Sequence, residues 1–439
     1  MSRETNHPID KVRQLQRKLY IQAKKCPTRR FHALYERIHD WEVLNESWKR
    51  VRQKQGSPGV DDVTIKAIEA QGVEAFLKGI QTYLKEGRYH PSPVRRIHIP
   101  KPDGTKRPLG IPTIRDRVVQ MAAKIVIEPV FEADFKKDSY GFRPKRSPLE
   151  ALERIRELSN KGYNHILDAD IQKCFDRISH DKLMACLEQR LSDRKVLKLI
   201  RKWLKAGVME SGEVKDNLVG TPQGGVISPL LANILLHEMD KSWESQYATL
   251  GVLIRYCDDF VVMSKTPRAI REARRRIEVL LNNLSLELHP DKTKLVDLSW
   301  GRGRFEFLGH TLKKVYSGKY QGKFFLNRWP SPKSMTNLYR KIKAITHYRR
   351  PVRNIQVMIP ELNRLLQGWS NYFRSGNASR KFVQVEKYLW QRLILFINRR
   401  RGYPRPHRYG TRGYEWYRNL GIYRLIGIIR YPKARASYA

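Results

Sequence analysis

Two adjacent carboxylates, Asp258 and Asp259, lie between two short runs of apolar residues. Residues 252–254 and 260–262 have the β-branched and aromatic composition of buried strands, which predicts a hairpin with both acids at its tip. Charges at the end of an apolar hairpin are costly to bury unless a cation neutralises them. Carboxylate oxygens suit a divalent metal ion. For these residues alone, a solvated Asp-Asp turn is the simpler alternative.

A second acidic site lies earlier in the chain, where Asp168 and Asp170 fall within a predicted strand over residues 166–171. Side chains two positions apart on a strand point the same way, so one of these acids can meet the hairpin acids if the strands are neighbours. Phosphoryl transfer by two metal ions about 3.5–4 Å apart requires at least two carboxylates. The two acidic sites together meet that requirement, although either one alone also fits solvated strand-end acids.

Two further stretches suit a ligand that carries phosphates. Residues 94–99 alternate as a strand and continue through an Asp-Gly turn signal, which predicts a hairpin. This hairpin carries three cations that could bind a triphosphate: Lys101, Lys106 and Arg107. Residues 220–225 read Gly-Thr-Pro-Gln-Gly-Gly before an apolar helix, and such a loop allows close approach of a nucleotide or template base. A solvated hairpin and a helix-entry turn are the alternatives.

The rest of the chain must supply the elements that position these sites. Residues 10–84 have apolar side chains at helical spacing, interrupted by a loop of Gly56, Ser57, Pro58 and Gly59. A length of 439 residues predicts two or three domains. The four cysteines form neither a zinc-site pair nor a disulfide framework, which predicts a reduced, cytosolic protein. No secretory signal and no run of membrane-spanning length is apparent.

The chain is strongly basic, with 86 Lys and Arg residues against 43 acids and a formal net charge of +43. The excess is concentrated in residues 301–439, which hold 31 basic and 4 acidic residues. Such a surface favours a polyanion, and nucleic acid is preferred over a general solubility charge or a membrane surface. Aromatic residues between these charges are predicted to stack on bases: Tyr403, Tyr409, Tyr414, Trp416, Tyr417 and Tyr423.

Taken in order, these blocks resemble those of a reverse transcriptase. The matching stretches are Lys101 to Arg107, residues 170–176, residues 221–225, the Tyr-Cys-Asp-Asp of 256–259, residues 288–294 and the Phe-Leu-Gly of 307–309. Residues 139–144 and 223–233 resemble the group II intron-encoded type in particular. Residues 366–373, Leu-Gln-Gly-Trp-Ser-Asn-Tyr-Phe, resemble the maturase or thumb domain of that family, so that the resemblance covers roughly residues 40–430.

The resemblance implies an α+β fold, a right-hand polymerase of fingers, palm and thumb. Its palm sheet would be antiparallel, and its N-terminal extension and thumb would be helical. The domains implied are an N-terminal extension with a template-contacting loop over 1–85, a fingers and palm reverse transcriptase domain over 86–310, a thumb or maturase domain over 311–400, and a basic aromatic nucleic-acid-binding segment over 401–439.

The resemblance also implies roles for single residues. The catalytic carboxylates would be Asp170, Asp258 and Asp259, and two Mg²⁺ ions would be bound by Asp170, Asp258 and the carbonyl of Ile171. The dNTP pocket would comprise Lys101, Arg107, Gln223 and Phe175, with the Phe175 ring excluding a ribose 2′-hydroxyl. Lys292 would be a general acid, with Lys294 as the alternative. Template and RNA contacts would come from Gly56, Ser57, Pro58, Gly59, Arg399, Arg400 and Arg401.

The function implied is an RNA-directed DNA polymerase that also binds its intron RNA to promote splicing and retromobility. Its partners would be intron RNA, an RNA template with a DNA primer, target DNA and dNTPs, and it would have no membrane partner. Its location would be the bacterial cytoplasm, with nucleoid association during action on DNA. A splicing factor without polymerase activity, and a domesticated enzyme of DNA repair or phage defence, are the alternatives.

The sequence departs from the family pattern in two places. Cys257 replaces the alanine of the family's commonest Tyr-Ala-Asp-Asp hairpin. Because both residues are small and apolar, activity is expected to be retained, with altered fidelity or redox sensitivity. No cysteine follows Cys257, whereas many relatives carry a C-terminal His-Asn-His endonuclease with cysteine pairs. No such nuclease is therefore expected, as in the shorter bacterial group IIC lineage.

Overall fold

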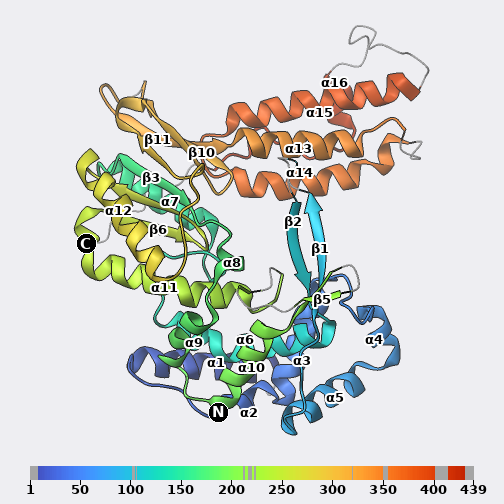
Figure 1. Ribbon diagram of the computed structural model, residues 1–439. Helices are drawn as coiled ribbons and strands as arrows, with labels where there is room; N and C mark the ends of the chain where they lie inside the picture. The colour runs from blue at the N-terminus through green and yellow to red at the C-terminus, as the bar shows by residue number, and fades with distance from the viewer. Residues whose placement is uncertain are drawn as a thin grey trace, which may run out of the picture. The chain divides into compact units, whose positions relative to one another are not determined.

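The computed structural model describes residues 8–100, 104, 106–210, 213–215, 220–221, 224–318, 320–349, 354–400 and 414–430 (Figure 1). The chain forms two compact units, each assembled from separate parts of the sequence. The first comprises Met1–Ser147, Ala169–Val262 and Arg271–Thr293, and the second comprises Pro148–Asp168, Met263–Ile270 and Lys294–Ala439. The predicted division into four domains remains a prediction.

The N-terminal part is helical, as its apolar spacing predicts. Its helices are α1 (Pro8–Lys25), α2 (Tyr35–Ile38), α3 (Trp41–Gln53), α4 (Ile65–Gln71) and α5 (Val73–Lys85). Helices α1 and α3 pack against α6 (Ile114–Glu132), whose side chains are buried nearly all round. Thr113 starts α6 because its hydroxyl accepts a hydrogen bond from the Asp116 amide.

The predicted basic hairpin is present as β1 (Val94–Pro100) and β2 (Lys106–Ile111), which pair antiparallel with Ile99 opposite Arg107. Two short strands extend this sheet: β4 (Val208–Glu210) runs parallel to β1, and β5 (Glu213–Lys215) runs antiparallel to β4. Gly104 in the connection has φ 83, a conformation that glycine adopts without strain.

The acidic sites belong to a four-stranded sheet of order β6-β7-β3-β8. Its strands are β3 (His165–Asp170), β6 (Val252–Tyr256), β7 (Asp259–Ser264) and β8 (Lys294–Asp297), and β3 is antiparallel to β8. The associated helices are α7 (Pro148–Asn160), α8 (Cys174–Arg177), α9 (His180–Glu188), α10 (Arg194–Lys205), α11 (Ser228–Gln246) and α12 (Pro267–Asn283), with the 3₁₀ turn η1 (Ala248–Leu250). The predicted α+β fold class is confirmed.

The C-terminal part of the second unit combines a small sheet with helices. The antiparallel strands β9 (Arg304–Phe307), β10 (His310–Tyr316) and β11 (Phe324–Pro330) follow the 3₁₀ turn η2 (Ser299–Gly301). The helices are α13 (Pro332–Ile345), α14 (Ile359–Phe373), α15 (Ser379–Arg400) and α16 (Tyr414–Asn419), with the 3₁₀ turn η3 (Ile355–Val357) between α13 and α14. No described helix is long and apolar enough to cross a membrane.

The aromatic residues after α15 correct one expectation. Tyr417 is only 3% exposed and belongs to the helical core, and Trp416 and Tyr423 pack against that core. Residues 414–430 are attached to the core helices, because the Glu386 carboxylate accepts hydrogen bonds from the amides of Leu425 and Ile426. Tyr417 is therefore a core residue and is not available to stack on a base. Tyr403 and Tyr409 lie outside the described residues.

Candidate active site

The acidic hairpin turns on two residues, Cys257 and Asp258, and Asp259 is the first residue of β7. Asp259 therefore lies in the strand, whereas the sequence predicted both acids at the tip of the hairpin. Cys257 has φ 63 and is almost completely buried. Burial raises the pKa of the Cys257 thiol to about 12, so the thiol stays protonated and unreactive. The redox sensitivity expected of this residue is not supported.

A neighbouring segment fixes the backbone of this turn from outside β6. The Arg255 amide donates to the Asp138 carbonyl at 2.9 Å, and the Tyr140 amide donates to the Arg255 carbonyl at 2.8 Å. Gly141 follows directly, and a Cβ placed there would lie 2.4 Å from the Cys257 nitrogen. A glycine is required at this position because the two backbones touch.

Arg255 connects the turn to helix α11 and is completely buried. Its Nε lies 2.8 Å from Asp240 Oδ1, and its Nη2 lies 2.5 Å from Asp240 Oδ2 and 2.9 Å from Ser139 Oγ. Its Nη1 donates to Asn233 Oδ1 at 2.9 Å and to the Cys257 carbonyl at 3.0 Å. All five N–H groups of the guanidinium are used, which only arginine can do.

Arg255 and Asp240 are not among the site residues predicted from the sequence, and no role was predicted for Asn233 or Ser139. The Asn233 amide also donates to the Gly141 carbonyl at 2.7 Å, so the network holds both the turn and the segment beside it. A charged residue inside an otherwise apolar strand was the available signal, because a buried arginine must be paired.

The structure brings Asp170 and Asp258 together. The Ile171 amide donates to the Asp258 carbonyl at 3.3 Å, and the His289 amide donates to the Asp170 carbonyl at 2.8 Å. Burial raises the pKa of Asp258, the charge of Asp170 raises it further, and the charge of Arg107 lowers it. Arg107 on the β1–β2 hairpin is therefore close enough to influence the same carboxylate as Asp170.

A cation already accompanies this acidic pair. Lys292 Nζ lies 2.6 Å from Asp170 Oδ2. Within the described part of the chain, no three His, Cys, Asp or Glu residues are arranged as a ready metal site. The donor chemistry nevertheless fits a hard divalent ion, because two nearby carboxylates repel each other until a cation neutralises them. The Lys292 ammonium neutralises Asp170 in the protein alone.

Phe175 lies on the short helix α8, which begins at Cys174, four residues after Asp170. The residue before this helix, Lys173, has the left-handed φ of 46. The Phe175 carbonyl accepts a hydrogen bond from the Thr221 amide at 2.7 Å. Gly220 packs so closely on α8 that a Cβ would lie 2.7 Å from the Asp176 carbonyl oxygen. The glycine-rich loop therefore begins directly against the helix that carries Phe175.

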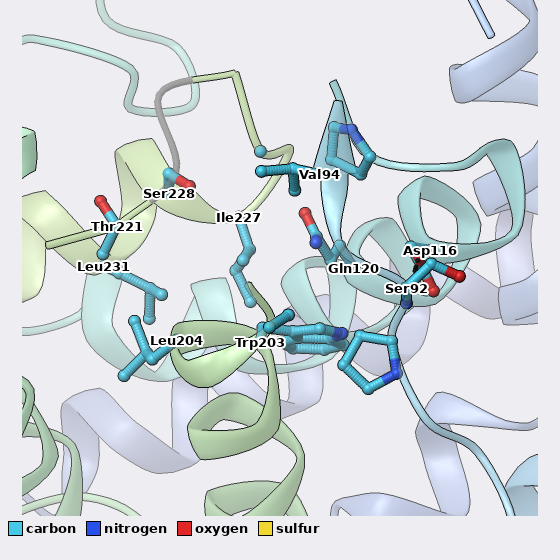
Figure 2. A pocket seen from close by; sticks show the side chains of 14 residues that line it. Ser92, Val94, Asp116, Gln120, Trp203, Leu204, Thr221, Ile227, Ser228 and Leu231 are labelled. Atoms are coloured by element: carbon cyan, nitrogen blue, oxygen red, sulfur yellow. Dashed lines mark hydrogen bonds between the residues drawn. The ribbon is translucent and has the colours of Figure 1, made fainter. Parts of the chain in front are cut away.

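The same loop ends against the β1–β2 hairpin. A Cβ at Gly224 would lie 2.6 Å from the Gly110 carbonyl oxygen of β2, and the Val226 amide donates to Gln120 Oε1 at 2.9 Å. Figure 2 shows a cavity below this loop, with Trp203 and Ile227 among its walls. Its volume is about 20 Å³, which holds a water molecule and excludes a nucleotide.

The predicted template-contacting loop is attached to the start of α6. Gly59 packs on Thr113, where a Cβ would lie 2.6 Å from the Thr113 Cα. Arg117 donates through Nη2 to the Ser57 carbonyl and through Nε to the Pro112 carbonyl at 2.9 Å. Gly56 and Ser57 remain exposed, so the loop presents a fixed backbone to solvent.

The remaining predicted site residues are only partly described. Lys101, Gln223 and Arg401 lie outside the described residues, and only the backbone of Arg400 is described. Arg399 is exposed, and its guanidinium lies 4.9 Å from the centre of the Tyr348 ring. Such a planar cation–aromatic pair is suited to nucleic-acid contact.

Two family models match the chain. The model described as Reverse transcriptase (RNA-dependent DNA polymerase) matches residues 99–312, and that described as Group II intron, maturase-specific domain matches residues 335–414. Protein YkfC of Escherichia coli (strain K12) is 35% identical over an alignment of 339 residues that covers 69% of this chain and 88% of YkfC. The chain belongs to the group II intron-encoded reverse transcriptases.

A second relative of this reverse transcriptase is the Group II intron-encoded protein LtrA of Lactococcus lactis subsp. cremoris. It is 45% identical over 214 residues, 48% of this chain and 35% of LtrA. The chain thus spans most of YkfC but about a third of LtrA. Among solved structures, telomerase from Candida albicans aligns with a TM-score of 0.41 and 14% identity, over 74% of this chain and 64% of that one.

The family assignment makes the protein an RNA-directed DNA polymerase of a class that generally uses a divalent metal and binds nucleic acid. The maturase-specific match contacts the Phe-Leu-Gly stretch, which lies within the reverse transcriptase match. Leu308 and Gly309, with φ 48 and 73, form the two-residue turn between β9 and β10. The Tyr372 hydroxyl of the maturase-specific domain donates to the Leu308 carbonyl at 2.9 Å and fixes this turn.

Proposed function

We propose that this reverse transcriptase copies RNA into DNA at a site formed by Asp170, Asp258 and Asp259, with two Mg²⁺ ions. The observation that supports this most directly is the convergence of Asp170 and Asp258, with Arg107 acting on the same carboxylate. Asp170, Asp258 and the Ile171 carbonyl would hold these ions, and Asp259 would complete the catalytic carboxylates. Mg²⁺, when bound, lowers the pKa of a primer 3′-hydroxyl and stabilises the charge of the departing pyrophosphate.

The chain's own residues would do the positioning. Arg107 and Lys101 would hold the triphosphate of a dNTP, since a guanidinium binds phosphate through two parallel hydrogen bonds. Gln223 would line the nucleotide pocket. The half-buried Phe175 ring would lie beneath the sugar and exclude a 2′-hydroxyl. Lys292 would leave Asp170 when that carboxylate ligates a cation, and its ammonium would then donate a proton to the leaving group.

We further propose that the protein binds a folded intron RNA and stabilises its splicing-active shape, which supports splicing and retromobility. The maturase-specific match and the strongly basic last third of the chain support this. The four-domain division, contact of the Gly56–Gly59 loop with template, and contact of Arg399, Arg400 and Arg401 with RNA or target DNA belong to this proposal. The site of action would be the bacterial cytoplasm and its nucleoid.

Primer extension on an RNA template tests the polymerase proposal. Asp258→Ala should abolish DNA synthesis and leave RNA splicing intact, because splicing needs RNA binding and not these carboxylates. Asp181→Ala, which changes an exposed acid on α9, is the matched control and should extend primers normally. Splicing without any extension by the wild-type protein would favour the alternative of a pure splicing factor.

A further inference from the structure

An exposed aromatic cluster lies on the second compact unit, where η2 meets the ends of β10 and β11. Trp300 is 69% exposed, and its ring meets Phe324 edge to face at 5.9 Å. Phe324 in turn meets Tyr316, which is opposite it in the β10–β11 ladder, at 5.5 Å. These three residues are called the aromatic platform below. A contiguous exposed apolar patch, unlike a single exposed apolar side chain, marks an interaction surface.

The backbone that presents Trp300 is strained. Trp300 has φ 55, a left-handed conformation that is costly for a bulky side chain. The next residue, Gly301, has φ 70 and packs so closely on β10 that a Cβ would lie 2.8 Å from the Lys314 carbonyl oxygen. The fold therefore holds an exposed tryptophan in an unfavourable conformation, and such strain is concentrated at functional positions.

The charge around the aromatic platform identifies the kind of ligand. Residues 298–325 include six Lys and Arg residues and one acid. Arg302, Arg304 and Lys323 are exposed. An acidic or phosphate-bearing ligand is favoured, and aromatic rings beside cations are the usual way to hold unpaired bases while contacting their phosphates.

We propose that the aromatic platform binds an unpaired nucleobase of a nucleic-acid strand by stacking on Trp300, with Arg302 and Lys323 contacting the flanking phosphates. This site goes beyond the proposed function, because it lies outside the polymerase centre. Tyr316 and Phe324 also fall between the two matched family ranges, which end at 312 and resume at 335. An RNA or a DNA strand offers the same base chemistry, and the experiment separates them.

The experiment measures binding of three labelled probes to the full-length protein: oligouridylate, its DNA counterpart, and an abasic oligonucleotide of equal length. Elevated salt weakens phosphate contacts elsewhere on the protein and leaves stacking largely unchanged. Trp300→Gly removes the ring and relieves the strained φ, so the melting temperature should not fall. Its affinity for the base-bearing probes should fall about fivefold to a hundredfold, and its affinity for the abasic probe should be unchanged.

Two further variants and a crosslinking measurement complete the test. Trp300→Phe should retain most of the binding, and Tyr83→Ala, which removes an exposed ring of the first unit, should retain all of it. A 5-iodouridine oligonucleotide should crosslink to the aromatic platform in the wild-type protein. Loss of binding on RNA alone, on DNA alone or on both identifies the strand and supports the site.

Two results would overturn the proposal: wild-type affinity of Trp300→Gly for both base-bearing probes, or an equal loss on the abasic probe. Primer extension by Trp300→Gly on a short primer–template should match the wild type. A failure of this site is thereby distinguished from a failure of the polymerase centre.

Discussion

Replacement of Arg255 should separate stability from catalysis. Arg255→Met leaves the Asp240 carboxylate buried without its bidentate partner, and breaking such a buried pair costs about 3–5 kcal/mol. It also frees the Cys257 carbonyl of the catalytic turn, which Arg255 Nη1 holds at 3.0 Å. A displacement of about 1 Å at a reacting group lowers the rate roughly a hundredfold. Arg255→Met should therefore be both less stable and slower.

A second substitution distinguishes these effects. Arg255→Met combined with Asp240→Leu leaves no unpaired charge, and a hydrophobic replacement of a buried ion pair is often nearly neutral. The double variant should regain part of the lost stability in urea unfolding. Its kcat for primer extension should stay about a hundredfold low, because nothing then holds the Cys257 carbonyl.

A matched control comes from the same unit. Arg190 is also buried and lies 3.0 Å from Asp134, far in sequence from the catalytic turn. Arg190→Met should lower stability and leave kcat unchanged at a temperature where the protein stays folded. Wild-type kcat in the Arg255→Met/Asp240→Leu variant would refute the positioning role of Arg255.

Phe175→Ala should gain incorporation of rNTPs in primer extension with its dNTP activity largely kept; no gain would remove its role in sugar selection. Gly141→Ala should lower kcat, because the added Cβ would lie 2.4 Å from the Cys257 nitrogen, and a wild-type rate would contradict that contact. Burial lowers the pKa of His310 to about 4, so between pH 6.5 and pH 4 only the unfolded chain binds a proton at this residue. The free energy of unfolding therefore decreases as the pH is lowered through this range. His310→Gln should remove about 2 kcal/mol of the difference in unfolding free energy between pH 7 and pH 5, and an unchanged difference would exclude this titration.

The elements could be predicted from sequence wherever a local pattern sets them. The apolar runs around Asp258 form β6 and β7, the Asp-Gly signal lies between β1 and β2, and Thr113 caps α6 as a threonine before a helix does. The pairing of Asp170 with Asp258 required only that two predicted strands be close in one sheet. Prediction of each strand, turn and helix start needed only neighbouring residues, and prediction of the acid pair needed one assumption about which strands are neighbours.

The support of the site could not be predicted in the same way. Arg255, Asn233 and Asp240 meet because a strand and a helix pack together, and Ser139 joins them from more than a hundred residues away in sequence. The base-stacking role predicted for Tyr417 is wrong, because its ring is buried in the helical core. In the sequence, an aromatic residue among cations has the same pattern in both cases. Only tertiary packing separates these cases.

Binding of Mn²⁺, followed by electron paramagnetic resonance in the presence of a primer–template and dNTP, tests most directly whether Asp170 and Asp258 hold a shared cation. The wild-type protein should bind Mn²⁺, and Asp170→Ala and Asp258→Ala should each remove that binding. Wild-type Mn²⁺ affinity in either variant would contradict the polymerase centre described above.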